Sequence, residues 1–139
     1  IAGGGEQLTL RVVAKYANYA NYFGTPETFR RKTAVLQEHC REVGRDFDEI
    51  TLTRNLDCLI AADEAQLEEK AAEWGKRMPG NRTVDQWKEH SLYGTPDQVV
   101  AQIREIGALG IDYVIVYFAD ATWGDGMGIF GEQVIPALS

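Results

Sequence analysis

The sequence predicts an α/β fold in which parallel strands alternate with helices, and three observations carry this prediction. An aromatic-Gly-Thr-Pro-acid motif that is typical of a helix start occurs twice, in residues 23–27 and again in residues 93–97. Between the two motifs, residues 50–60 alternate apolar and polar side chains, as a strand does. Residues 111–118 are nearly all apolar and β-prone, which is typical of a parallel strand buried on both faces.

Both motifs have the residues that favour helix initiation. The threonine can cap the helix, the proline fits its first position, and the acidic residue complements the helix dipole. An apolar stripe then follows the first motif as far as Gly44, at spacings of three and four residues that predict one helix face: Phe29, Thr33, Leu36, Cys40 and Val43. A second helix follows the other motif, with Val99, Ile103 and Ile106 on one face, and ends within residues 107–110.

The remaining elements follow from similar local patterns. Asp63 and Gln66 are spaced as a capping box for a further helix over residues 65–76. A helix is also expected over residues 8–17 and a short strand over residues 18–23, so that three strands are predicted in all. Residues 77–92 are polar and punctuated by Pro79 and Gly80, and we interpret them as an insertion that is either functional or surface decoration.

The chain opens on Ile1-Ala2-Gly3-Gly4-Gly5-Glu6, directly before the first predicted helix. Free backbone amides in a glycine loop, together with the positive end of a helix, form an anion site that most often holds phosphate. The strand that should lead into this loop is expected before residue 1, so the sequence predicts a piece of a larger α/β protein. The alternative is a tag remnant or an N-terminal tail.

Composition excludes several classes of protein. A net charge of −7 argues against binding to nucleic acid. No apolar run reaches the roughly 20 residues of a membrane span, and no stretch resembles a secretory signal, so we expect a cytoplasmic protein without a membrane partner. Cys40 and Cys58 lack metal-ligand spacing, and we expect them to be buried free thiols.

Several stretches together resemble the luciferase-like flavin and deazaflavin oxidoreductases, and most of all the subgroup that uses the deazaflavin coenzyme F-420. The resemblance covers almost the whole chain apart from residues 77–92, and it rests on the order and spacing of the matching stretches. These are residues 1–6, 8–17, 18–21, 24–27, 39–45, 94–97, 107–116 and 130–138.

The resemblance implies the fold and the cofactor. Members are (β/α)8 barrels, and residues 1–139 would form a single partial domain, the C-terminal half of such a barrel, with strands six, seven and eight and the end of strand five. The cofactor would bind at the C-terminal mouth of the barrel. Coenzyme F-420 is the expected cofactor, because residues 18–45 resemble the deazaflavin subgroup more closely, and flavin mononucleotide is the alternative.

The resemblance also implies cofactor-binding residues. In such proteins the loop after strand five helps to hold the cofactor phosphate, and this loop corresponds to Gly3, Gly4 and Gly5, with Glu6 as a further candidate. Arg11 and Lys15, one turn apart on the following helix, could add positive charge for an acidic cofactor tail. Their alternative role is a solvated helix face.

Four aromatic residues at strand ends are candidates for a cofactor or substrate pocket: Tyr22, Phe23, Phe118 and Trp123. Plain core packing is the alternative role for each of them.

No catalytic residue is assigned from the sequence, which shows no Ser-His-Asp, Cys-His or metal constellation. His39 is expected on the surface, and His90, within residues 77–92, is expected to be solvated. Asp120 and Asp125 flank Trp123 and could carry out proton transfer, but capping of the following helix is their alternative role. In this family the flavin or deazaflavin ring itself would supply the hydride chemistry.

Two classes of function follow. The first is a fragment of an oxidoreductase that transfers hydride between coenzyme F-420 and an organic substrate, or of a flavin-dependent monooxygenase, and the fragment alone is expected to be inactive. The second is a non-catalytic half-barrel that binds a phosphate ligand or self-associates. A half-barrel exposes strand edges and apolar faces, so we expect a homodimer or a larger assembly.

Overall fold

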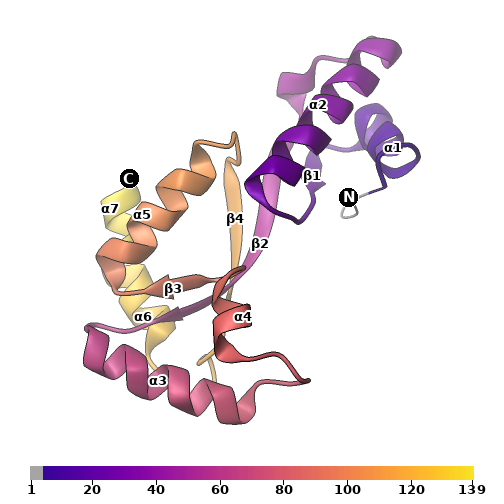
Figure 1. The fold of residues 1–139 in the computed structure, drawn as a ribbon. Helices are drawn as coiled ribbons and strands as arrows, with labels where there is room; N and C mark the ends of the chain where they lie inside the picture. Colours follow the sequence, from indigo (N-terminus) through magenta and orange to yellow (C-terminus); the bar gives the residue numbers. More distant parts are fainter. Residues whose placement is uncertain (1–4) are drawn as a thin grey trace. The chain divides into compact units, whose positions relative to one another are not determined.

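The computed structural model describes residues 5–139, so Gly3 and Gly4 of the predicted anion loop lie outside the described residues. The chain divides into two compact units. The first unit comprises the described residues up to Asn55 together with Ile106–Ile115, and the second comprises Leu56–Glu105 together with Val116–Ser139. Two strands, β2 (Thr51–Ile60) and β4 (Tyr113–Phe118), continue from the first unit into the second (Figure 1).

The elements alternate between helix and strand as predicted. The first unit also contains α1 (Thr9–Tyr16), β1 (Tyr19–Asn21), α2 (Pro26–Val43) and the 3-10 turn η1 (Phe47–Glu49). The second unit also contains α3 (Glu64–Arg77), α4 (Val84–Lys88), β3 (Leu92–Gly94), most of α5 (Pro96–Gly107), α6 (Gly126–Ile129), the π-helical turn η2 (Phe130–Val134) and α7 (Ile135–Leu138). No helix within residues 5–139 combines the length and the apolar character that crossing a membrane requires.

All strand pairs run in parallel. β1 pairs with the beginning of β2, from Tyr19 opposite Thr51 to Asn21 opposite Thr53. β3 pairs with the end of β2, where Cys58 lies opposite Leu92. β4 also pairs with β2. Its direction follows from two hydrogen bonds, from Asp112 N to Leu52 O (3.1 Å) and from Ala119 N to Cys58 O (2.9 Å), because both residue numbers increase together.

The sequence predicted three strands, and the structure has a fourth, β3, which the sequence analysis missed. A strand of three residues is too short to show a period, and β3 follows directly after residues 77–92. That segment is not simply surface decoration. It contains α4, which starts at a capping box formed by Thr83 and Gln86, and its Trp87 is buried against Leu59 and Trp74 in the core of the second unit.

The two Gly-Thr-Pro motifs both start helices, but they cap them differently. Thr25 Oγ1 accepts a hydrogen bond from Thr28 N (3.2 Å), as predicted. In the second motif, the Thr95 amide donates to Gln98 Oε1 instead (2.9 Å). Both glycines have positive φ values, 136° at Gly24 and 152° at Gly94, which residues other than glycine rarely adopt.

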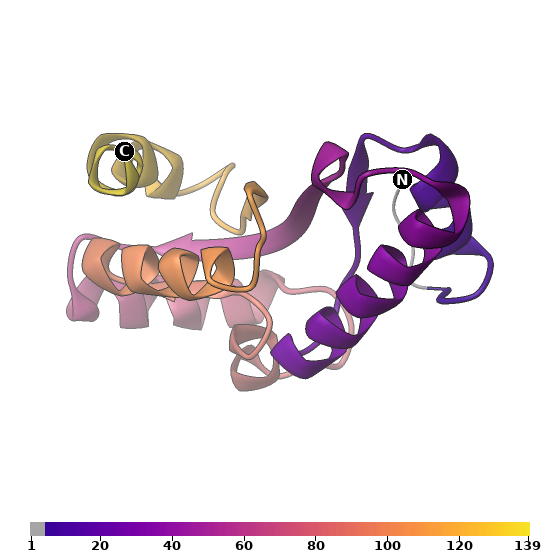
Figure 2. The same ribbon diagram turned by 90° about the horizontal axis from the view of Figure 1, so that it is seen from above.

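The core of the first unit lies between β1, β2 and the two helices α1 and α2, which pack against each other (Figure 2). The predicted stripe on α2 faces this core: Phe29, Leu36 and Cys40 are buried, and Val43 packs partly buried against them. Gly44 ends the helix in the left-handed conformation, with a φ of 70°.

The faces of β4 correct one expectation. The sequence pattern is typical of a strand covered on both faces, but Tyr113, Ile115 and Tyr117 are 55%, 37% and 55% exposed, while the alternate side chains are half-buried. A strand with apolar side chains on both faces is buried on both faces only where the sheet is complete. Within residues 5–139, nothing covers the face of β4 that carries Tyr113, Ile115 and Tyr117. Tyr113 instead contacts the edge of the Tyr19 ring, with 6.4 Å between ring centroids.

Candidate functional site

A groove of about 650 Å³ lies where the turn before α1 meets the first half of α2. Backbone and side chains from both segments line it: Gly5, Glu6, Gln7, Leu8, Thr9, Thr28, Arg31 and Lys32. Two cations and two hydroxyl groups therefore face the same open space. We call this feature the α1–α2 groove.

The charges in the α1–α2 groove favour an anion. Glu6 Oε1 lies 3.0 Å from the Arg31 guanidinium, whereas Lys32 has no ion-pair partner among the described residues. α1 has no side-chain cap and no acidic residue in its first turn. Of its first amides, that of Leu10 already donates to the carbonyl oxygen of Gly5 (3.0 Å), so only the others could serve an external acceptor. A Cβ atom at Gly5 would lie 2.9 Å from Thr9 Oγ1, so glycine is the residue that keeps this part of the groove open.

Only some of the residues predicted to bind phosphate line the groove. Gly5 and Glu6 line it, but Arg11 does not, because its guanidinium turns to Glu42 of α2 at 3.7 Å. Lys15, near the other end of α1, is exposed and is not among the residues that line the groove. The sequence analysis missed Arg31 and Lys32. The signal for them was present, since residues 30–32 are three consecutive basic residues just inside a capped helix.

His39 is not on the surface, which corrects the expectation. Its side chain is 11% exposed, its Nε2 lies 2.9 Å from the carbonyl oxygen of Glu6, and its Nδ1 lies 3.4 Å from Glu42. A carbonyl oxygen only accepts, so Nε2 donates this hydrogen bond. His39 therefore holds the backbone at Glu6 against α2, and the chain before α1 covers a helix face that the sequence left open.

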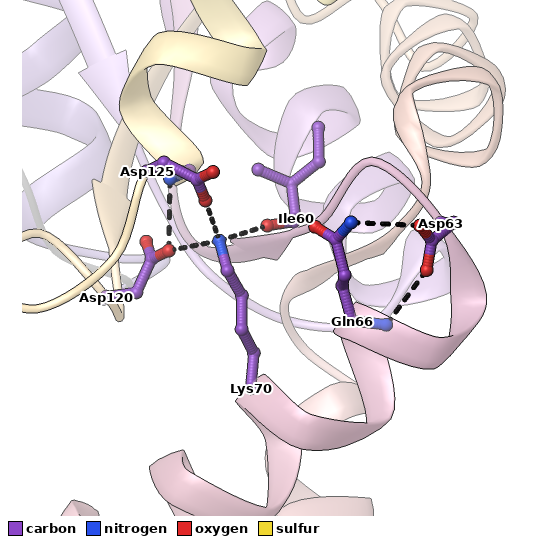
Figure 3. Close-up of polar contacts among 7 residues, drawn as sticks. Ile60, Asp63, Gln66, Lys70, Asp120 and Asp125 are labelled. Atoms are coloured by element: carbon purple, nitrogen blue, oxygen red, sulfur yellow. Dashed lines mark hydrogen bonds and ion pairs between the residues drawn. The ribbon is translucent and has the colours of Figure 1, made fainter.

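A second polar cluster lies in the second unit, at the ends of two parallel strands (Figure 3). Lys70 of α3 extends its ammonium group to the carbonyl oxygen of Ile60, the last residue of β2, at 2.9 Å. The same nitrogen lies 2.6 Å from Asp120 Oδ2 and 2.6 Å from Asp125 Oδ1, in the loop after β4. Asp120 is fully buried, whereas Asp125 is 67% exposed.

The loop after β4 wraps around the Asp120 carboxylate. The Gly126 amide donates to Asp120 Oδ2 at 3.0 Å, so Asp120, rather than Asp125, accepts from the start of α6. A Cβ atom at Gly124 would overlap the Asp120 carboxylate and lie 2.7 Å from its Cβ and Cγ atoms, which explains why glycine stands there. Asp120 Oδ1 is buried and has no hydrogen-bond partner among residues 5–139. The cluster thus ties α3, β2 and this loop together through one buried carboxylate.

The charges of this cluster reinforce one another. Burial by itself would lower the pKa of Lys70, but hydrogen bonds to Asp120 and Asp125 and their negative charges outweigh it, and the pKa is raised. The hydrogen bond from Lys70 holds the pKa of Asp125 below its ordinary value. Lys70 and Asp125 therefore stay charged at neutral pH, in an arrangement suited to positioning the loop rather than to proton transfer.

Beside the cluster lies an open pocket of about 480 Å³, lined by Gln66, Glu69, Lys70, Glu73, Trp123, Gly124 and Asp125. Trp123, one of the candidate pocket residues, thus lines this pocket, and the guanidinium of Arg77 lies 5.3 Å from the centre of its ring. Phe118 packs edge-on against Phe130 at 5.4 Å, inside the same unit.

The other predicted residues lie in different surroundings. Tyr22 is 1% exposed and packs on Phe29, and its hydroxyl lies 2.7 Å from Thr33 Oγ1, so that burial raises its pKa. Phe23 is 55% exposed. His90 is exposed, as expected. Tyr22 and Phe23 belong to the first unit and Phe118 and Trp123 to the second.

Both cysteines are buried and free, as predicted. Burial is the main reason why the pKa of Cys58 is raised to about 12, and burial also raises the pKa of Cys40. Within residues 5–139, no group of three or more His, Cys, Asp or Glu side chains is placed to hold a metal ion.

No family model matches the sequence, and neither does any curated protein. Solved structures, however, match 99% of the chain. The coenzyme F-420-dependent tetrahydromethanopterin reductase from Methanopyrus kandleri has 19% identity and a TM-score of 0.70. A secondary alcohol dehydrogenase dependent on F-420, in complex with an F-420–acetone adduct, has 18% identity and a TM-score of 0.76. The EDTA monooxygenase from Chelativorans sp. BNC1 has 19% identity and a TM-score of 0.74.

The chain spans about half the length of these proteins: the matches cover 50%, 48% and 43% of them, respectively. Parallel strands alternate with helices along the chain. The chain therefore has the fold of about one half of each of these enzymes, and the resemblance seen in the sequence is confirmed at the level of the fold.

Proposed function

We propose that the chain is the C-terminal half of a luciferase-like oxidoreductase that transfers hydride between coenzyme F-420 and an organic substrate. The observation that carries the proposal is the match of 99% of the chain to enzymes whose names include F-420-dependent reductases and dehydrogenases. The two free, buried cysteines fit the cytoplasm as its location.

The α1–α2 groove supports the proposal, because a cofactor of this class carries a phosphate group. Arg31, Lys32 and the amides at the start of α1 would hold that phosphate, and Gly3 and Gly4 remain proposed parts of the same site. Arg11 would act at longer range, since Glu42 already neutralises its charge. The role of the chain at this end is to fix the anionic part of the cofactor.

The Lys70 cluster, in the second unit, is a separate feature that supports the proposal. Ile60 ends β2 and Asp120 lies two residues after β4, and the carboxyl ends of parallel strands are where barrels of this kind bind ligands. By anchoring this loop, Lys70 fixes Trp123, which we propose as part of a pocket wall together with Phe118. Phe23, in the first unit, stays a separate candidate for a pocket residue. The bound deazaflavin ring would supply the hydride chemistry.

Flavin mononucleotide is the alternative cofactor. The EDTA monooxygenase and a riboflavin lyase solved with modified FMN match the chain as well as the F-420 enzymes do, with TM-scores of 0.74 and 0.75. Parallel fluorescence titrations of the protein with F-420 and with FMN decide between them. Tighter, saturable binding of F-420 is expected. Tighter binding of FMN would assign the chain to the flavin monooxygenases, and binding of neither would refute the cofactor proposal.

A non-catalytic, self-associating half-barrel is the second candidate function. The exposed face of β4, with Tyr113 and Ile115 in the first unit, favours it, because large apolar side chains on a sheet face are usually covered. This candidate predicts assembly without cofactor binding, whereas the oxidoreductase proposal predicts both.

A further inference from the structure

We infer that Glu6 is an internal competitor for the anion site: its carboxylate occupies Arg31 in the empty α1–α2 groove and must leave when a phosphate-type anion binds. The inference rests on the proposed anion site, and it reverses the role expected for Glu6 as a direct cofactor ligand. A carboxylate cannot hold a phosphate dianion, because the two groups repel each other at contact distance.

The Glu6 carboxylate contacts Arg31 at the place where an external anion would bind. Its Oε1 lies 3.0 Å from the Arg31 guanidinium, and both side chains line the groove. The Glu6 carboxylate is thus an internal anion, already bound in the groove that Arg31, Lys32 and two threonines line. Arginine binds carboxylate and phosphate through the same fork of donors, so one Arg31 cannot serve both fully.

The surroundings of Glu6 allow its side chain to move while its backbone stays in place. His39 Nε2 donates to the Glu6 carbonyl oxygen at 2.9 Å, and this hydrogen bond fixes the main chain against α2. The Glu6 side chain is 33% exposed, so it has solvent to turn into. Release of Glu6 therefore changes one ion pair and leaves the wall of the groove intact.

The charge count gives the expected size of the effect. Arg31 and Lys32 contribute two positive charges and Glu6 one negative charge, so removing the charge of Glu6 raises the local charge from +1 to +2. Removal also frees the Arg31 fork. We expect Glu6→Gln to tighten phosphate binding about three- to tenfold, and less at high salt because ions screen an open groove.

The test is a titration with inorganic phosphate at low ionic strength, followed by NMR through the backbone amides of Gly5 and Thr9. Glu38→Gln is the matched control. Glu38 lies on α2, the helix of Arg31, pairs with Arg41, is 56% exposed and does not line the groove. Its substitution therefore makes the same change in net charge as Glu6→Gln, but away from the groove. Glu6→Gln should tighten binding, and Glu38→Gln should leave the dissociation constant nearly unchanged.

A double-variant cycle separates competition from simple repulsion. If Glu6 acts by occupying Arg31, most of the gain from Glu6→Gln disappears in the Arg31→Gln background, and only the smaller part due to removal of the charge remains. A gain of unchanged size there, or an equal gain from Glu38→Gln, would overturn the inference while leaving the anion site in place. Absence of phosphate binding in every folded variant would overturn the inference and the proposed anion site together.

Discussion

The ammonium group of Lys70 lies 2.6 Å from the carboxylate of Asp120, a residue with none of its side-chain surface exposed. The two residues are 50 positions apart in the sequence, on α3 and in the loop after β4. Lys70 also contacts the carbonyl oxygen of Ile60 at the end of β2. One side chain therefore fixes three elements at the edge of the sheet where we propose that the substrate pocket lies.

Lys70→Met should destabilise the protein strongly. The variant leaves the Asp120 carboxylate buried without its counter-charge, and removing one partner of a buried ion pair costs about 3–5 kcal/mol. Urea unfolding followed by circular dichroism measures the loss. Lys76→Met on the same helix is the matched control, since its partnership with Glu73 is exposed and should matter little. Equal losses in the two variants would show that the Lys70 cluster does not hold this loop.

The contact between Lys70 and Asp125 should depend on pH. The pKa of Asp125 is lowered in the folded protein, so this contact stabilises above the ordinary aspartate pKa of about 3.9 and is lost as the pH falls through the lower native value. The pKa of Lys70 is raised, so the contribution persists until the pH rises through a native value above the ordinary lysine value of about 10.4.

Thermal melts of Asp125→Asn and the unsubstituted protein test this window. The difference should be nearly constant from about pH 5 to 9 and should shrink below pH 4, and it should stay under about 1 kcal/mol because Asp125 is exposed. A difference that keeps its size down to pH 3 would mean that Asp125 acts through something other than its charge.

Gly124→Ala tests the packing of the loop around Asp120. The added Cβ atom would lie 2.7 Å from the Cβ and Cγ atoms of Asp120, and overpacking of this kind costs about 1–3 kcal/mol. Gly128→Ala is the control, because nothing lies within 4 Å of its Cβ position and alanine favours a helix. Denaturant midpoints should fall for Gly124→Ala and stay level or rise for Gly128→Ala. The opposite order would contradict the contact.

Local signals explain what the sequence predicts well. The cap at Thr25, the proline after it, the apolar stripe on α2 and the left-handed Gly44 are all encoded within one helix, and the structure has each of them. The free, buried cysteines likewise follow from their places within a helix stripe and an alternating strand.

The features that sequence analysis missed depend on contacts between distant segments. The burial of His39 requires the chain before α1 to lie over α2, and nothing in α2 itself signals that cover. The partnership of Lys70 with Asp120 forms only when the loop after β4 returns to α3. β4 shows the opposite difference. Its sequence pattern is typical of a strand buried on both faces, but within residues 5–139 nothing buries one of them.

That exposed face predicts self-association. Tyr113 and Ile115 present apolar surface beside Tyr19, and a second copy is the simplest cover for it. Size-exclusion chromatography with light scattering at low micromolar concentration should give a dimer or larger assembly. Ile115→Lys should shift it toward the monomer, while Arg30→Gln on exposed α2 surface should not. A cooperative, well-folded monomer of the unsubstituted chain would contradict this prediction.

The most direct test of the account is whether coenzyme F-420 binds through the α1–α2 groove. Its fluorescence is titrated with the unsubstituted protein, with Arg31→Gln, and with Arg30→Gln, whose side chain does not line the groove. We predict saturable binding that weakens about tenfold or more in Arg31→Gln, is nearly unchanged in Arg30→Gln, and is displaced by inorganic phosphate. Absence of F-420 binding, or binding that neither Arg31→Gln nor phosphate weakens, would contradict the account.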